Sequence, residues 1–94
     1  MENQTQQRPN GSGEVEFPAL VLMLGTAAML HLGVTPDPVS GEAKANLAQA
    51  KEMIDLLNVV KVKTAGNLTS AESSMLDDLL FDLRMRYLEA VKRA

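Results

Sequence analysis

The sequence contains no cysteine and only one histidine, His31. Without cysteine, a single chain can form neither a disulfide bond nor a thiolate zinc site. One imidazole is also too few for a histidine-rich metal cluster. The aromatic residues are two phenylalanines and one tyrosine, with no tryptophan, which is too few for the stacking platforms that hold single-stranded nucleic acid. These absences favour a protein without catalytic residues, metal ligands or a cofactor.

The net charge is −3 at pH 7, which opposes general attraction to phosphate backbones. We therefore expect no nucleic-acid partner. A nucleic-acid accessory role is kept as a third hypothesis on the cations of the second half: Lys61, Lys63, Arg84, Arg86, Lys92 and Arg93. The composition is otherwise rich in Leu, Ala, Met and Val beside many charged residues, which is typical of packed helices. With 94 residues, the chain is long enough for one all-α domain.

The first sixteen residues are polar and contain Pro9, Gly11 and Gly13. Such a segment cannot bury enough apolar surface to offset the entropy lost on ordering. We predict a disordered N-terminal tail over residues 1–16 and a helical domain over residues 17–94. The tail lacks the apolar run of a secretory signal.

Residues 17–32 are apolar almost throughout and predict the first helix. Pro18 suits a first helical turn, where its missing N–H costs nothing, and Gly33 can end the helix. A helix that is apolar on every side is buried all round or lies in lipid. We therefore predict that this short helix is buried in a homo-oligomeric bundle, with Leu20 and Leu24 at the interface between chains.

Residues 33–41 contain two prolines and two glycines and predict a connection, in which Asp37 or Ser40 could cap the next helix. Residues 42–65 predict that second helix, because apolar residues recur at spacings of four and three. The resulting apolar seam consists of Ala43, Leu47, Ala50, Ile54 and Leu57.

The GNLT segment, residues 66–69, marks the boundary between the second and third helices. Gly66 can adopt the left-handed conformation that ends a helix. Thr69 and Glu72 have the spacing of a capping box, in which each side chain binds the other residue's backbone N–H. The predicted boundary residues are Gly66, Asn67, Leu68, Thr69 and Glu72.

Residues 70–93 predict a third helix with an inner apolar seam at Leu76, Leu80, Leu83, Tyr87 and Ala90. Two long helices joined by a short loop favour an antiparallel hairpin. Phe81, Met85 and Leu88 lie on roughly the opposite side of the third helix, so contact with the second helix cannot bury them. We predict that these three residues lie at an interface between identical chains, which usually close as a two-fold dimer. The alternative is a second core within one chain, covered by the first helix.

The sequence also resembles a known family. The segment from Ile54 to Glu72, IDLLNVVKVKTAGNLTSAE, is similar to a family of small bacterial proteins known as the domain of unknown function numbered eighteen forty-four. The similarity extends over roughly residues 17–88 and is carried by Phe17, Leu32-Gly33, Ile54-Asp55, Lys63-Thr64, Gly66 to Thr69, Glu72, Leu83-Arg84 and Tyr87. The resemblance implies a bacterial, cytoplasmic protein. It implies no activity, so no catalytic residue is carried over.

Three polar groups could carry chemistry but have simpler explanations. Lys63 to Gly66 has a lysine before its glycine, the reverse of a phosphate loop, and fits the end of a helix. His31 lies at the end of the first helix, where free carbonyls gather, with pH sensing as the alternative. A metal site is less favoured than a solvated face for the aspartates, which lack a histidine at matching spacing: Asp55, Asp77, Asp78 and Asp82.

These observations predict a non-enzymatic helical interaction or accessory protein that acts as a homo-oligomer, a dimer or larger. An unidentified protein partner is also possible within this hypothesis. The second hypothesis is a membrane-associated factor anchored by the apolar run 17–34, which lies at the lower limit of length for a spanning helix. No catalytic residue, cofactor or metal is expected under either hypothesis.

Overall fold

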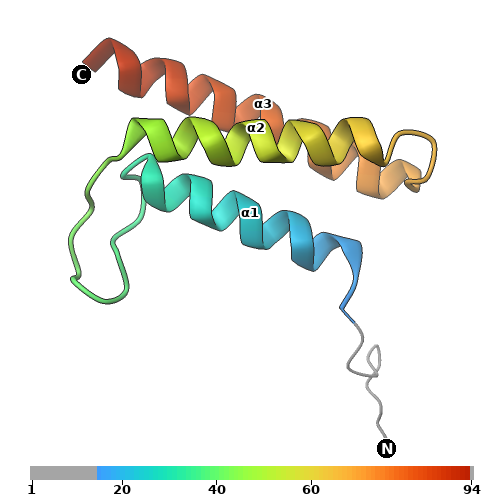
Figure 1. Cartoon of the computed structure of the whole chain (residues 1–94), viewed down its shortest axis with the longest axis horizontal. Helices are drawn as coiled ribbons and strands as arrows, with labels where there is room; N and C mark the ends of the chain where they lie inside the picture. The colour runs from blue at the N-terminus through green and yellow to red at the C-terminus, as the bar shows by residue number, and fades with distance from the viewer. Residues whose placement is uncertain (1–14, 94) are drawn as a thin grey trace, which may run out of the picture.

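The computed structural model describes residues 15–93, which form three α-helices (Figure 1). They are α1 (Phe17–His31), α2 (Leu47–Lys63) and α3 (Ser70–Arg93), and these described residues contain no strand. The prediction of an all-α fold with three helices is confirmed. The predicted tail lies outside the described residues except for Val15 and Glu16, both of which are exposed.

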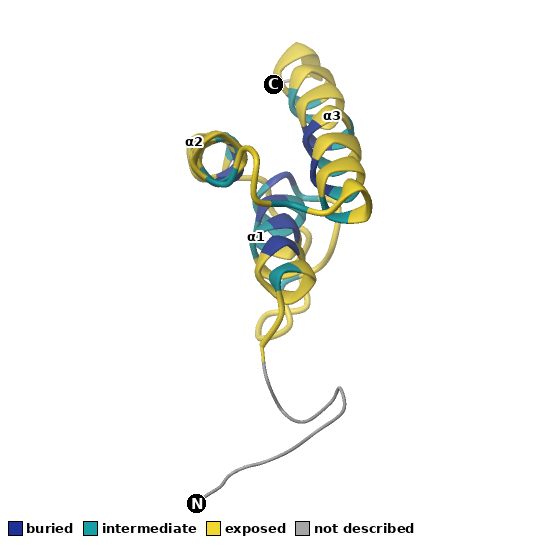
Figure 2. Cartoon of the chain, turned by 90° about the vertical axis from the view of Figure 1, so that its right-hand side faces the viewer, coloured by how far each residue is buried: buried dark blue, intermediate teal, exposed yellow. Residues whose placement is uncertain are grey.

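The three helices lie side by side and alternate in direction. In Figure 1, α1 runs from right to left, α2 returns from left to right and α3 runs from right to left again. A long connection, residues 32–46, joins α1 to α2, and residues 64–69 form the shorter connection from α2 to α3. Seen from the end, the helices surround a shared centre, toward which the buried residues face (Figure 2).

The core is entirely apolar within residues 15–93, and every helix contributes to it. Its buried members are Val21, Ala28, Leu32, Ala50, Ile54, Leu57, Leu76, Leu80 and Leu83. Within each helix the buried residues recur every three or four positions when Gly25 of α1 is included, so each helix presents one apolar side to its neighbours. The seams predicted on the second and third helices are thus the sides that pack together, with the exception of Ala43.

The C-terminus of α1 is closed by Gly33, which adopts a φ of +79°. The Gly33 N–H donates to the carbonyl of Leu30 at 3.0 Å, and the Val34 N–H donates to the carbonyl of Met29 at 3.1 Å. This pair of bonds is a Schellman motif, and it satisfies two carbonyls that a helix end leaves free. A side chain at Gly33 would be strained by the positive φ and would lie 3.3 Å from Ala45.

The second helix begins at Leu47, five residues later than the predicted start at residue 42. Asn46 has an extended backbone, and its side-chain oxygen accepts a hydrogen bond from the Gln49 N–H at 3.2 Å. Its own N–H donates to the His31 carbonyl at 2.7 Å, which ties the start of α2 to the end of α1. The predicted seam residue Ala43 therefore lies in the connection and is exposed.

The cap of α2 is Asn46 and neither of the two residues suggested for it. The Asp37 carboxylate accepts hydrogen bonds from the N–H groups of Val39 at 2.7 Å and Ser40 at 3.3 Å. The Ser40 hydroxyl accepts one from the Glu42 N–H at 3.3 Å. Both side chains stabilise turns within the connection, so they are unavailable to a helix that begins further along.

Candidate interaction surface

The start of α3 is fixed by the boundary residues of the GNLT segment. The Thr69 N–H donates to Glu72 Oε1 at 2.9 Å, and the Glu72 N–H donates to Thr69 Oγ1 at 3.1 Å. Gly66 adopts a φ of +86°, and the Asn67 N–H donates to the Thr64 carbonyl at 2.9 Å. Leu68 is half-buried and packs against the core. The segment therefore turns the chain and satisfies backbone donors at the start of α3.

Two polar contacts join α2 and α3 outside the buried core. Lys61 Nζ lies 2.8 Å from Asp77 Oδ1, and Arg84 Nη2 donates to Asn58 Oδ1 at 2.9 Å. Both contacts are partly exposed to solvent, so their contribution to stability is small. The buried seam of α3, Leu76, Leu80 and Leu83, faces the other helices, and the opposite side of α3 is exposed to solvent (Figure 2).

The outer side of α3 carries an apolar stripe, which we define as Phe81, Met85 and Leu88. Their exposed fractions are 69%, 50% and 55%. At about 100° per residue, the centre of this stripe lies about 150° around the helix from the core seam. α1 packs against α2 and α3 on the core side. The alternative in which the first helix covers these three residues within one chain is therefore wrong.

The outer side of α1 carries a second exposed apolar surface. Leu22 and Met23 are 69% and 63% exposed, and Leu20 is 38% exposed. Leu24 is half-buried and packs against the core of its own chain. Of the two α1 residues predicted at an oligomer interface, Leu20 is thus the more available, and Leu24 is partly used within the chain. One side of α1 is buried by Val21, Gly25 and Ala28.

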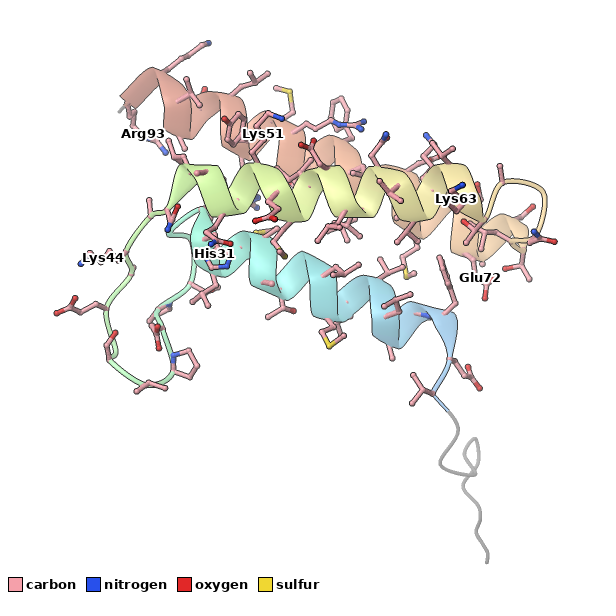
Figure 3. All side chains as sticks on the ribbon, viewed as in Figure 1. His31, Lys44, Lys51, Lys63, Glu72 and Arg93 are labelled. Carbon is pink, nitrogen blue, oxygen red and sulfur yellow. The ribbon has the colours of Figure 1, made fainter. Side chains whose placement is uncertain are left out.

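The polar groups considered as possible sites do not gather in one place: His31 ends α1 and Lys63 ends α2, toward opposite ends of the helices (Figure 3). Within residues 15–93, no three carboxylates or imidazoles lie close enough together to hold a metal ion. Asp55 lies 2.8 Å from Lys51 Nζ, and its hydrogen bond and charge raise the pKa of Lys51 above the ordinary value. Asp82 forms an ion pair with Arg86, at 2.9 Å from Arg86 Nε. None of the helices in this range has both the length and the apolar character needed to span a bilayer.

A profile of the family described as "Domain of unknown function (DUF1844)" matches residues 14–89. The chain belongs to this family. No curated protein and no solved structure matches the chain. The resemblance found from the GNLT segment and its neighbours is therefore confirmed, and the DUF1844 match covers α1, α2 and α3 as far as Glu89.

Several residues that carry the DUF1844 resemblance meet in one groove between α2 and α3. This groove has a volume of about 280 Å³, and the atoms exposed on its walls are almost entirely apolar. It is lined by Lys51, Ile54, Asp55, Arg84, Tyr87 and Leu88. Sequence reasoning missed it because its two walls are some thirty residues apart. The predicted antiparallel hairpin was the available signal, since that arrangement brings the start of α2 to the end of α3, but the register of the two helices was not predicted.

Proposed function

We propose that this DUF1844 protein is a non-enzymatic helical interaction protein of the bacterial cytoplasm that acts as a homo-oligomer, a dimer or larger. The observation that supports this proposal is the stripe of Phe81, Met85 and Leu88, each at least half exposed. Large apolar side chains gathered on one side of a helix are typical of a surface that another chain covers.

The magnitude of the apolar contribution supports a weak to moderate association. Complete burial of such a side chain contributes about 1.5–3 kcal/mol, and roughly half of that remains to be gained, because each is already half covered. Two stripes packed together bring six side chains into contact. The summed contribution of these six side chains is of the same order as the free energy that association costs in lost translational and rotational freedom, about 4–15 kcal/mol. A stable assembly therefore needs contacts beyond the stripe.

The exposed surface of α1 supports a second element of the proposal, an accessory role with a different protein partner. Leu22 and Met23 lie on α1, away from the α3 stripe, and are the most exposed large apolar residues of that helix. Copurification from the native cell tests this element. A specific protein that is retained by wild type and lost with Leu22→Glu/Met23→Glu supports it. Recovery of the chain only with lipid, released by detergent, would favour the membrane-associated alternative.

Light scattering on the purified full-length chain tests self-association. We expect a mass at least twice that of one chain for wild type, and a monomer for Phe81→Glu/Leu88→Glu. The matched control is Leu22→Glu/Met23→Glu, which places the same two charges on the exposed surface of α1 and should leave the assembly intact. A monomeric wild type would contradict the proposal. Loss of assembly in the control alone would move the interface to α1.

A further inference from the structure

The apolar stripe of α3 lies between two opposite charges. Asp78 precedes Phe81 by one turn, Lys92 follows Leu88 by one turn, and both are exposed. With about 100° per residue, Asp78, Lys92 and the three stripe residues fall within about 80° of the helix circumference. The two charges also stand seven residues on either side of Met85, a distance of about 10 Å along the axis in each direction.

We propose that a second copy of this chain packs antiparallel against the outer side of α3, across a two-fold axis near Met85, so that Asp78 of each copy faces Lys92 of the other. This inference rests on the proposed self-association and adds its direction and register. A two-fold axis perpendicular to the helix places the residue seven positions before Met85 opposite the one seven positions after it. The symmetry therefore forms two identical ion pairs, one at each end of the apolar contact.

The same charges disfavour a parallel pair. If two α3 helices packed in parallel with Met85 in register, Asp78 would face Asp78 and Lys92 would face Lys92. Like charges at both ends repel, and this repulsion would be combined with the same apolar contact. Charge thus selects a second copy in one orientation, whereas an unrelated apolar partner would have no reason to match this pattern.

The acidic residues along one edge of the stripe already form ion pairs with basic residues of the same chain. Asp82 and Glu89 flank the stripe on the side away from α2, where the antiparallel register would bring them near their counterparts. Asp82 is paired with Arg86 at 2.9 Å, and Glu89 with Arg93 at 3.3 Å. These intrachain pairs reduce the repulsion between acidic edges, so the two ends of the stripe decide the orientation.

The opposite edge of the stripe continues into the apolar groove between α2 and α3. Leu88 belongs both to the stripe and to the wall of this groove, together with Ile54 and Tyr87. Phe81 lies four residues before Met85 and Leu88 lies three residues after it, so the antiparallel register places Phe81 of the second copy beside Leu88, at the edge of the groove. The aromatic ring would there gain apolar contact that the stripe alone does not supply.

Charge reversal tests the orientation in the full-length chain. Asp78→Lys and Lys92→Asp should each raise the dissociation constant of the dimer about tenfold, because attraction becomes repulsion at both ends. The combined variant Asp78→Lys/Lys92→Asp should restore the wild-type constant within about threefold, since opposite charges face each other again. Glu42→Lys, in the exposed connection, is the control for Asp78→Lys, because it makes the same change in net charge, and it should have no effect. A combined variant weaker than either single variant would overturn the proposal.

Cysteine cross-linking tests the register independently, because the chain has no cysteine of its own. Under mild oxidation Met85→Cys should form a disulfide with itself, since residues near the axis come within the Cα separation that a disulfide allows, about 4.4–6.8 Å. Asp78→Cys should cross-link with Lys92→Cys in a mixture and with itself only at background level. Efficient self-linking of Asp78→Cys would indicate the parallel pair and overturn the proposal.

These outcomes separate the two proposals. A wild type that stays monomeric refutes self-association and this inference with it. A wild type that dimerises and is dissociated by Phe81→Glu/Leu88→Glu, but is unchanged by charge reversal, supports self-association and refutes only the antiparallel register. All the substituted positions are exposed, so we expect every variant to fold. Circular dichroism of each variant checks that a loss of assembly does not come from unfolding.

Discussion

Gly25 of α1 lies against Leu79 of α3, so close that a Cβ atom added at Gly25 would stand 2.9 Å from Leu79 Cδ2. Gly25 is buried in the middle of its helix, although glycine there destabilises a helix by about 1 kcal/mol relative to alanine. The contact explains its presence, because a missing side chain lets α1 approach α3 and close the core side of the molecule.

We expect Gly25→Leu to destabilise the fold by more than about 2 kcal/mol, because its side chain would have to displace Leu79 from the packed interior. Gly25→Ala should change stability by less than about 1 kcal/mol, since the atom in its way is the end of a flexible side chain and alanine favours the helix. Urea unfolding measures both. Equal stability of the leucine variant and wild type would show that α1 is not packed closely on α3.

The capping box at the start of α3 should stabilise the fold by about 0.5–2 kcal/mol. Thr69→Ala removes the oxygen that accepts the Glu72 N–H and should lower stability by that amount. Glu72→Gln is the matched control, because its amide oxygen can still accept the Thr69 N–H. Thermal unfolding of both variants measures the difference. Two variants that melt at the same temperature as wild type would show that the box does not stabilise the helix start.

Gly66 is expected to matter only for its backbone conformation. Its φ is +86°, and an added Cβ would meet nothing within 4 Å, so no neighbour has to move. We expect Gly66→Ala to cost about 1–2 kcal/mol from the left-handed conformation alone, and Gly66→Asn to cost less, because asparagine adopts positive φ more readily. A larger loss for asparagine than for alanine in chemical denaturation would mean that space, not φ, limits this position.

The core and the outer surface should respond very differently to truncation. Leu80 is 1% exposed, so Leu80→Ala should cost about 2–5 kcal/mol through lost burial and the cavity left behind. Leu22 is 69% exposed, and Leu22→Ala should change stability by less than about 0.5 kcal/mol. Denaturation at low protein concentration measures both without a contribution from assembly. Comparable losses at the two positions would contradict the described packing of α1.

Local patterns were sufficient to predict most of the helical structure. The third helix begins and ends where the sequence predicts, at Ser70 and Arg93, because Thr69 can cap it and the apolar spacing continues to its end. The first helix ends at His31, one residue before the predicted end, since Gly33 is the natural residue for the left-handed position that follows. In these places the determinants lie within a few residues of the boundary.

Predictions from the sequence were wrong or missing where a helix boundary or a groove depends on contacts with another part of the chain. Residues 42–46 favour a helix by composition, but the hydrogen bond from the Asn46 N–H to the His31 carbonyl joins two segments that only the fold brings together. The groove between α2 and α3 also needs the register of two helices. The sequence alone identifies Asp78 and Lys92 as charged residues. Their equal spacing from Met85 indicates a packing register only once the outer side of α3 is known to be exposed to solvent.

We propose above that two copies of the chain associate through the outer side of α3. Sedimentation equilibrium of the wild-type chain over a series of concentrations tests it most directly, with Phe81→Glu/Leu88→Glu run alongside. We predict a reversible equilibrium between one and two or more chains for wild type, and a single chain throughout for the variant. A wild type that sediments as one chain at every concentration, with the same profile as the variant, would contradict association through α3.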